Sequence, residues 1–82
     1  MADVTYYGAD WCTDCRRSKA FMTKNNVAFV ENNVEESAEL AAQAEQIAGR
    51  KNIPVIVFAD GAHLVEPSDA ALQTALAERG LI

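Results

Sequence analysis

The chain contains two cysteines, Cys12 and Cys15, in the segment Trp11-Cys12-Thr13-Asp14-Cys15, which lies between a strand-like run and a helix-like run. The unpaired N–H groups and the positive dipole end of a helix N-terminus favour a thiolate over a thiol. The thiolate is the attacking species in disulfide exchange. The second cysteine, one helical turn further on, is close enough to resolve a mixed disulfide. This spacing predicts a thiol–disulfide exchange centre with Cys12 as the nucleophile and Cys15 as the resolving thiol.

A cysteine pair of this kind can also have a structural role. A disulfide across so short a loop removes little conformational entropy from the unfolded chain. A zinc site needs about four ligands, and the sequence offers only these cysteines and one distant histidine, His63. The redox interpretation is therefore favoured, and no metal site is expected. The alternative of a different class is a metal- or iron–sulfur-binding module that uses Cys12 from two chains.

The composition limits the possible functions. The 82 residues are enough for a single domain, and half of them are hydrophobic. A net charge of −5 argues against a surface that binds nucleic acid or an anionic membrane. No run is long enough to span a membrane, and the start, Met1-Ala2-Asp3-Val4, lacks the pattern of a secretory signal. We expect a monomer in the reducing cytoplasm, where such a motif is more often catalytic than structural.

Residue patterns predict the elements that must position the cysteines. Strands are expected at 4–7, 27–31, 55–58 and 62–65, and helices at 12–25, 38–48 and from Ser68 as N-cap to Gly80. For the helix at 38–48, Ser37 is the expected N-cap, Gly49 ends it, and its apolar stripe is Leu40, Ala41, Ala44, Ile47 and Ala48. A strand–helix–strand start implies a right-handed parallel crossover. Asp60-Gly61 signals a hairpin, which adds antiparallel strands. The prediction is an α/β fold in the order β-α-β-α-β-β-α, with a mixed four-stranded sheet flanked by helices.

With these motifs the chain resembles the glutaredoxin family of the thioredoxin-fold superfamily. The shared residues are Tyr7 with Trp11-Cys12-x-x-Cys15, Ile53-Pro54-Val55, Gly61-x-His63-Leu64 and Ser68-Asp69. The most similar subfamily is the mycoredoxins of actinobacteria, which resemble Phe58-Ala59-Asp60-Gly61, Leu64 and Pro67-Ser68. The resemblance implies a thioredoxin-like fold and no bound cofactor. It also implies reduction of mixed disulfides between proteins and a low-molecular-weight thiol, which an NADPH-dependent reductase recycles.

The resemblance also implies roles for residues outside the cysteine motif. A cis Pro54 lies beside the reactive sulfur and lets the Ile53 backbone pair with the peptide-like part of the substrate. Ser68 and Asp69 contact the substrate through backbone N–H groups. Apart from the resemblance, Trp11 is expected to form a wall beside the sulfur, with packing in the core as the alternative. From the residues alone, Ser68 and Asp69 are a helix cap and a first-turn acid, and Pro54 is equally consistent with a trans proline that begins a strand.

One departure from the family pattern concerns the thiol that is used. Glutaredoxins that use glutathione have Gly-Gly before the last helix, where this chain has Val65-Glu66. The carboxylate of Glu66 is expected to oppose glutathione by like-charge repulsion. It could instead accept hydrogen bonds from the neutral sugar hydroxyls of mycothiol. Mycothiol is therefore the expected co-substrate, with glutathione as the alternative.

A second departure lies between the cysteines, where Thr13-Asp14 replaces the residues usual in glutaredoxins. Asp14 is expected to disfavour the Cys12 thiolate by charge repulsion, and Arg16 and Arg17 to offset it. Asp14 is equally consistent with a solvated acid that complements the helix dipole. Trp-Cys-x-Asp-Cys also resembles some thioredoxin-related proteins. The runner-up function is therefore a dithiol redoxin, thioredoxin-like or a donor to ribonucleotide reductase, that is recycled by thioredoxin reductase.

Overall fold

The computed structural model describes residues 3–82 and has the predicted element order. The strands are β1 (Val4–Gly8), β2 (Phe29–Asn33), β3 (Val55–Phe58) and β4 (His63–Val65), and the helices are α1 (Thr13–Lys24), α2 (Ala38–Ala48) and α3 (Asp69–Glu78). Met1 and Ala2, which entered the expectation about a secretory signal, lie outside the described residues. Between residues 3 and 82, no helix is both long enough and apolar enough to cross a membrane.

The strands form one mixed sheet in the order β2-β1-β3-β4. β1 runs parallel to β2 and antiparallel to β3, which in turn is antiparallel to β4. Val4 in β1 lies opposite Phe29 on one side and Phe58 on the other. Because β1 is an inner strand, the cysteine segment that follows it emerges at the middle of one end of the sheet. The predicted α/β fold with a mixed four-stranded sheet is confirmed.

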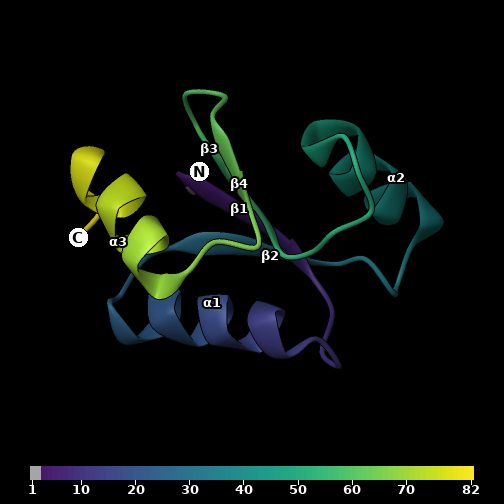
Figure 1. Cartoon of the computed structure of the whole chain (residues 1–82), viewed down its shortest axis with the longest axis horizontal. Helices are drawn as coiled ribbons and strands as arrows, with labels where there is room; N and C mark the ends of the chain where they lie inside the picture. The colour runs from purple at the N-terminus through teal and green to yellow at the C-terminus, as the bar shows by residue number, and fades with distance from the viewer. Residues whose placement is uncertain (1–2) are drawn as a thin grey trace.

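The helices cover both faces of the sheet, with α1 and α3 on one face and α2 on the other (Figure 1). The core against α1 and α3 is the larger, and its buried members include Val4, Tyr6, Cys15, Met22, Ile56, Leu72 and Leu76. The core against α2 is built on Tyr7, Ala44 and Val55. Successive β1 residues therefore pack into different cores, as the alternation of side chains along a strand requires.

Local signals set the bounds of α2. The Ser37 hydroxyl accepts hydrogen bonds from the N–H groups of Glu39 and Leu40 at 3.2 and 3.3 Å, which makes Ser37 the predicted N-cap. Gly49 ends the helix with φ +77°, a left-handed conformation that glycine adopts without steric cost. One detail differs from the expectation, because Ala41 is exposed and does not belong to the buried stripe.

The second strand begins later than predicted, at Phe29 and not at Val27. Asn26 adopts φ +58°, and the N–H of Val27 donates to the Met22 carbonyl at 2.9 Å. Val27 is buried, but it closes the turn that leaves α1 and so does not pair in the sheet. An apolar residue next to a strand cannot be told from a strand residue by its pattern alone, because both are buried.

Candidate active site

Cys12 is the N-cap residue of α1. Its backbone is extended, and its Sγ accepts a hydrogen bond from the N–H of Cys15 at 3.2 Å. The sulfur thus occupies the place where a Ser, Thr or Asp oxygen usually satisfies a free N–H group. That N–H group and the positive end of the helix dipole both stabilise negative charge on the sulfur. Cys12 retains 9% of its surface and borders the core.

Cys15 differs from Cys12 because it is completely buried. Burial, and then the hydrogen bond with Cys12, raise the pKa of the Cys15 thiol from 9.0 to about 12. Both cysteines are free thiols. The arrangement separates a thiol at the N-terminus of α1 from a completely buried thiol one helical turn further on.

The proline loop lies next to Cys12. The Ile53–Pro54 peptide bond is cis, as the family resemblance implies. The Cys12 thiol donates to the Ile53 carbonyl oxygen, with Sγ 3.9 Å away. The Pro54 carbonyl accepts the N–H of Glu66 at 2.9 Å, so the segment before α3 is fastened to the same loop. Three segments that are distant in sequence therefore meet around the Cys12 sulfur.

Glu66 stands in that segment with φ +49°, a conformation in which side-chain residues are uncommon. Its Oε1 accepts a hydrogen bond from Nδ2 of Asn52 at 2.9 Å. This contact directs the carboxylate toward the residue that precedes Ile53. A negative charge therefore lies at the edge of the proline loop.

The N-terminus of α3 lies next to α1. The Ser68 hydroxyl accepts the N–H of Ala71 at 3.1 Å, so it serves as the helix cap. Asp69 lies 3.6 Å from Nε of Arg17, and Nη2 of Arg17 donates to the Pro67 carbonyl at 3.3 Å. These contacts join α1 to the start of α3 on the side of the sheet that carries the cysteines.

Asp14 pairs with Arg17 and not with Arg16. Oδ1 of Asp14 lies 3.2 Å from Nη1 of Arg17, and both side chains are about half exposed. Within residues 3–82, no ion pair involves Arg16, whose side chain points into solvent. Of the two arginines considered from the sequence, Arg17 is therefore the one that counters the Asp14 charge at this site.

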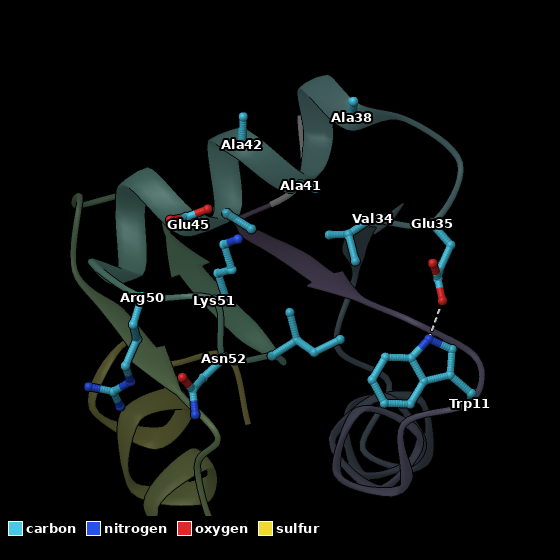
Figure 2. A pocket seen from close by; sticks show the side chains of 12 residues that line it. Trp11, Val34, Glu35, Ala38, Ala41, Ala42, Glu45, Arg50, Lys51 and Asn52 are labelled. Carbon is cyan, nitrogen blue, oxygen red and sulfur yellow. Dashed lines mark hydrogen bonds between the residues drawn. The ribbon is translucent and has the colours of Figure 1, made fainter.

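Trp11 lies beside a groove on the α2 side of the proline loop. Its indole is 68% exposed, and its N–H donates to the carboxylate of Glu35 (Figure 2). The groove has a volume of about 440 Å³, and α2 contributes small side chains to its wall. The lining residues are Trp11, Val34, Glu35, Ala38, Ala41, Ala42, Ala44, Glu45, Arg50, Lys51, Asn52 and Ile53. Sequence reasoning missed Glu35, which carries no motif signal and is identified only by its contact with Trp11.

The described residues offer little to a metal ion. Across residues 3–82, no three side chains of His, Cys, Asp or Glu gather closely enough to hold one. His63 is exposed in β4.

Several known proteins are similar to this chain in sequence or in fold. The glutaredoxin family profile matches residues 4–64. Two Mycobacterium tuberculosis proteins (strains CDC 1551 and H37Rv) that carry a glutaredoxin name are 34% identical over 68 residues, which is 82% of this chain and 81% of theirs. A glutaredoxin from Archaeoglobus fulgidus shares the fold, with a TM-score of 0.81 and 24% identity over 90% of this chain and 85% of that one. NrdH-redoxin from Escherichia coli does so with a TM-score of 0.72 and 24% identity, over 87% and 91%. The chain belongs to the glutaredoxin family of thiol–disulfide oxidoreductases, in the thioredoxin-fold superfamily.

Proposed function

We propose that this protein reduces mixed disulfides between proteins and a low-molecular-weight thiol, and that the thiol is mycothiol. The observation that carries the proposal is the position of the Cys12 sulfur, at the N-terminus of α1 and 3.9 Å from the Ile53 carbonyl oxygen. The helix N-terminus favours the thiolate, and the proline loop presents backbone groups beside it. The reaction needs no bound cofactor, because the electrons come from the thiol.

The reaction begins when the Cys12 thiolate attacks the sulfur of the small thiol in the mixed disulfide. The bond between that sulfur and the protein sulfur breaks, and the protein leaves as a thiolate that takes up a proton. Cys12 then carries the small thiol. A second small thiol attacks this adduct as a thiolate, forms a small-thiol disulfide and releases the Cys12 thiolate. An NADPH-dependent reductase returns the small-thiol disulfide to two thiols.

The surrounding loops hold the substrate. In this proposal the Ile53 backbone beside Pro54 pairs with the peptide-like part of the small thiol. The N–H groups at the start of α3, from Ser68 and Asp69, contact the same molecule; the Ser68 hydroxyl is already used as a cap. Trp11 lines the groove along α2. In this proposal the groove holds the protein part of the mixed disulfide, and Trp11 forms the wall between the groove and the sulfur.

The choice of mycothiol rests on Glu66. Its carboxylate is held at the proline loop by Asn52 at 2.9 Å. A glutathione carboxylate in this region would meet a like charge, whereas sugar hydroxyls can donate hydrogen bonds to Glu66. The Val65-Glu66 pattern in the sequence and the contact between Glu66 and Asn52 both support mycothiol as the thiol.

The test compares three reducing systems with one purified protein: mycothiol with its reductase, glutathione with its reductase, and NADPH with thioredoxin reductase. Turnover with mycothiol alone is the expected result. Glu66→Gly and the isosteric, neutral Glu66→Gln should then both gain activity with glutathione, because each removes the charge. A thiol preference that stays the same in both variants would show that Glu66 does not select the thiol.

Cysteine variants test the assignment of the two thiols. Cys12→Ser should abolish turnover, because no thiolate remains at the helix N-terminus. Cys15→Ser should keep the monothiol route, because that route uses Cys12 alone. Activity that survives in Cys12→Ser would overturn the choice of nucleophile.

A second candidate is a dithiol redoxin that thioredoxin reductase recycles. The E. coli NrdH-redoxin, whose fold is similar, is described as having a thioredoxin-like activity profile. In this case only the thioredoxin reductase system supports turnover, and Cys15 becomes essential. A metal- or iron–sulfur-binding module would instead give a coloured purified protein. For the first two candidates we propose a cytoplasmic monomer whose partners are oxidised proteins and the reductase.

A further inference from the structure

β1 presents two adjacent tyrosines to opposite faces of the sheet. Tyr6 is 3% exposed and packs in the core beneath α1, with its ring edge-on to Phe29 at 6.0 Å between centroids. Tyr7 faces α2, where its hydroxyl donates to Oε1 of Gln43 at 3.5 Å. Both rings are buried, but their hydroxyl groups lie in different surroundings.

The Tyr6 phenol lies above Gly8 and beside the Cys15 sulfur. A Cβ atom on Gly8 would stand 2.2 Å from the Tyr6 Oη and 3.0 Å from the Cys15 Sγ. The space above Gly8 is thus filled by the phenol and the thiol together. Gly8 has no positive φ, so it is needed here for space and not for backbone freedom. Because both atoms border the same point above Gly8, the phenol oxygen and the thiol sulfur are close neighbours in the core.

This contact gives the buried thiol a hydrogen-bond donor. Burial raises the pKa of Tyr6 well above its usual range, so the phenol keeps its proton whenever Cys15 loses its own. Burial likewise raises the pKa of Cys15 to about 12, whereas the neighbouring Tyr6 phenol lowers the pKa of the thiol. Hydrogen bonds to a charged partner are roughly twice as strong as neutral ones. The phenol therefore favours the form of Cys15 that can attack a disulfide.

We propose that Tyr6 is a positioning residue for Cys15, which holds its sulfur toward Cys12 and donates a hydrogen bond to the thiolate that resolves the mixed disulfide. The proposal rests on the function proposed above and concerns the alternative second step, in which Cys15 and not a second small thiol attacks the adduct on Cys12. In this step the Cys15 sulfur bonds to the Cys12 sulfur, and the bond from Cys12 to the small thiol breaks. The small thiol leaves with the electron pair and takes up the proton that Cys15 lost. The cysteine pair is oxidised, the small thiol is reduced, and Tyr6 keeps its proton throughout.

The test uses the aromatic disulfide 5,5′-dithiobis(2-nitrobenzoic acid) and the reduced protein. Attack by Cys12 releases one coloured thiolate, and resolution by Cys15 releases a second, so absorbance follows the two steps as separate phases. Tyr6→Phe should slow the second phase about tenfold, as expected for the loss of a hydrogen bond to a charged group, and leave the first phase unchanged. Tyr7→Phe is the matched control and should change neither phase. Cys15→Ser should remove the second phase and so identify it.

A second arm does not depend on the Phe variant. In Tyr7→Phe, Tyr6 is the only tyrosine of the chain, and biosynthetic replacement by 3-fluorotyrosine makes its phenol a stronger donor. The second phase should then be faster. An unchanged second phase in both arms, or equal slowing of both phases by Tyr6→Phe, would overturn the role of Tyr6. A first phase that persists in Cys12→Ser would instead refute Cys12 as nucleophile, so the two failures are distinguishable.

Discussion

The buried Cys15 thiol should make the protein lose stability at alkaline pH. In the unfolded chain the thiol ionises with its ordinary pKa of 9.0, and in the folded chain its pKa is about 12. The fold thus favours the protonated form. Its contribution to stability is fully present below pH 9 and is lost as the pH rises from 9 to about 12.

The size of the loss follows from the two pKa values. Between them, each pH unit removes about 1.4 kcal/mol from the free energy of unfolding. We therefore expect ionisation of Cys15 to lower the free energy of unfolding by about 1.4 kcal/mol near pH 10. The loss approaches about 4 kcal/mol as the pH reaches about 12.

The assay is urea unfolding followed by circular dichroism, near pH 8 and near pH 10, with a phosphine reductant to keep the thiols free. Cys15→Ala is the control, because it retains the other titrating groups, Tyr6 among them. The wild-type protein should lose about 1.4 kcal/mol more than Cys15→Ala between the two pH values. An equal loss in the two proteins would refute the argument that burial holds Cys15 protonated.

Three further variants test the packing around the site, each by urea unfolding at neutral pH. Ser18→Ala should raise the free energy of unfolding by about 1 kcal/mol, because the buried Ser18 hydroxyl has no hydrogen-bond partner within residues 3–82; a loss of stability would point to a partner. Gly8→Ala should cost about 1–3 kcal/mol by overpacking against the Tyr6 ring, and adding Tyr6→Ile should recover part of it; two independent, additive losses would contradict the contact. Leu72→Ala should cost about 2–5 kcal/mol, because Leu72 is completely buried between α3 and the sheet; a cost below 1 kcal/mol would not fit that packing.

Much of the fold could be predicted because its signals are local. Ser37 and Ser68 cap their helices as expected, and Gly49 ends α2. Strand–helix alternation and the Asp60-Gly61 turn predict a mixed four-stranded sheet, whereas the strand order β2-β1-β3-β4 is known from the structure. The cis bond at Pro54 is different, since the residues alone did not decide it and the family resemblance did.

The parts that could not be predicted depend on contacts between distant residues. Arg17 joins Asp14 to Asp69, and its adjacency to Arg16 gives no sign of which one does so. The bond from Trp11 to Glu35 requires the loop before α2 to approach the cysteine loop. No local preference encodes such approaches, because they follow from how the helices pack on the sheet.

The contact of Tyr6 with Cys15 is an intermediate case. Tyr6 and Gly8 are two residues apart in a strand, so they share a face. A large residue followed by glycine on the same face suggests that one fills the space left by the other. The sequence nevertheless does not show that Cys15 borders that space, which only the packing of α1 determines.

The position of Trp11 has a practical consequence for watching the enzyme at work. It is the only tryptophan in the chain, it directly precedes Cys12, and its indole is largely exposed. Indole fluorescence is quenched by nearby disulfides and shifts when the ring changes its surroundings. Emission from this one ring should therefore report the adduct on Cys12 in real time, without a label. Its hydrogen bond to Glu35 limits the orientations of the ring. Each state of the Cys12 sulfur should therefore give its own indole emission.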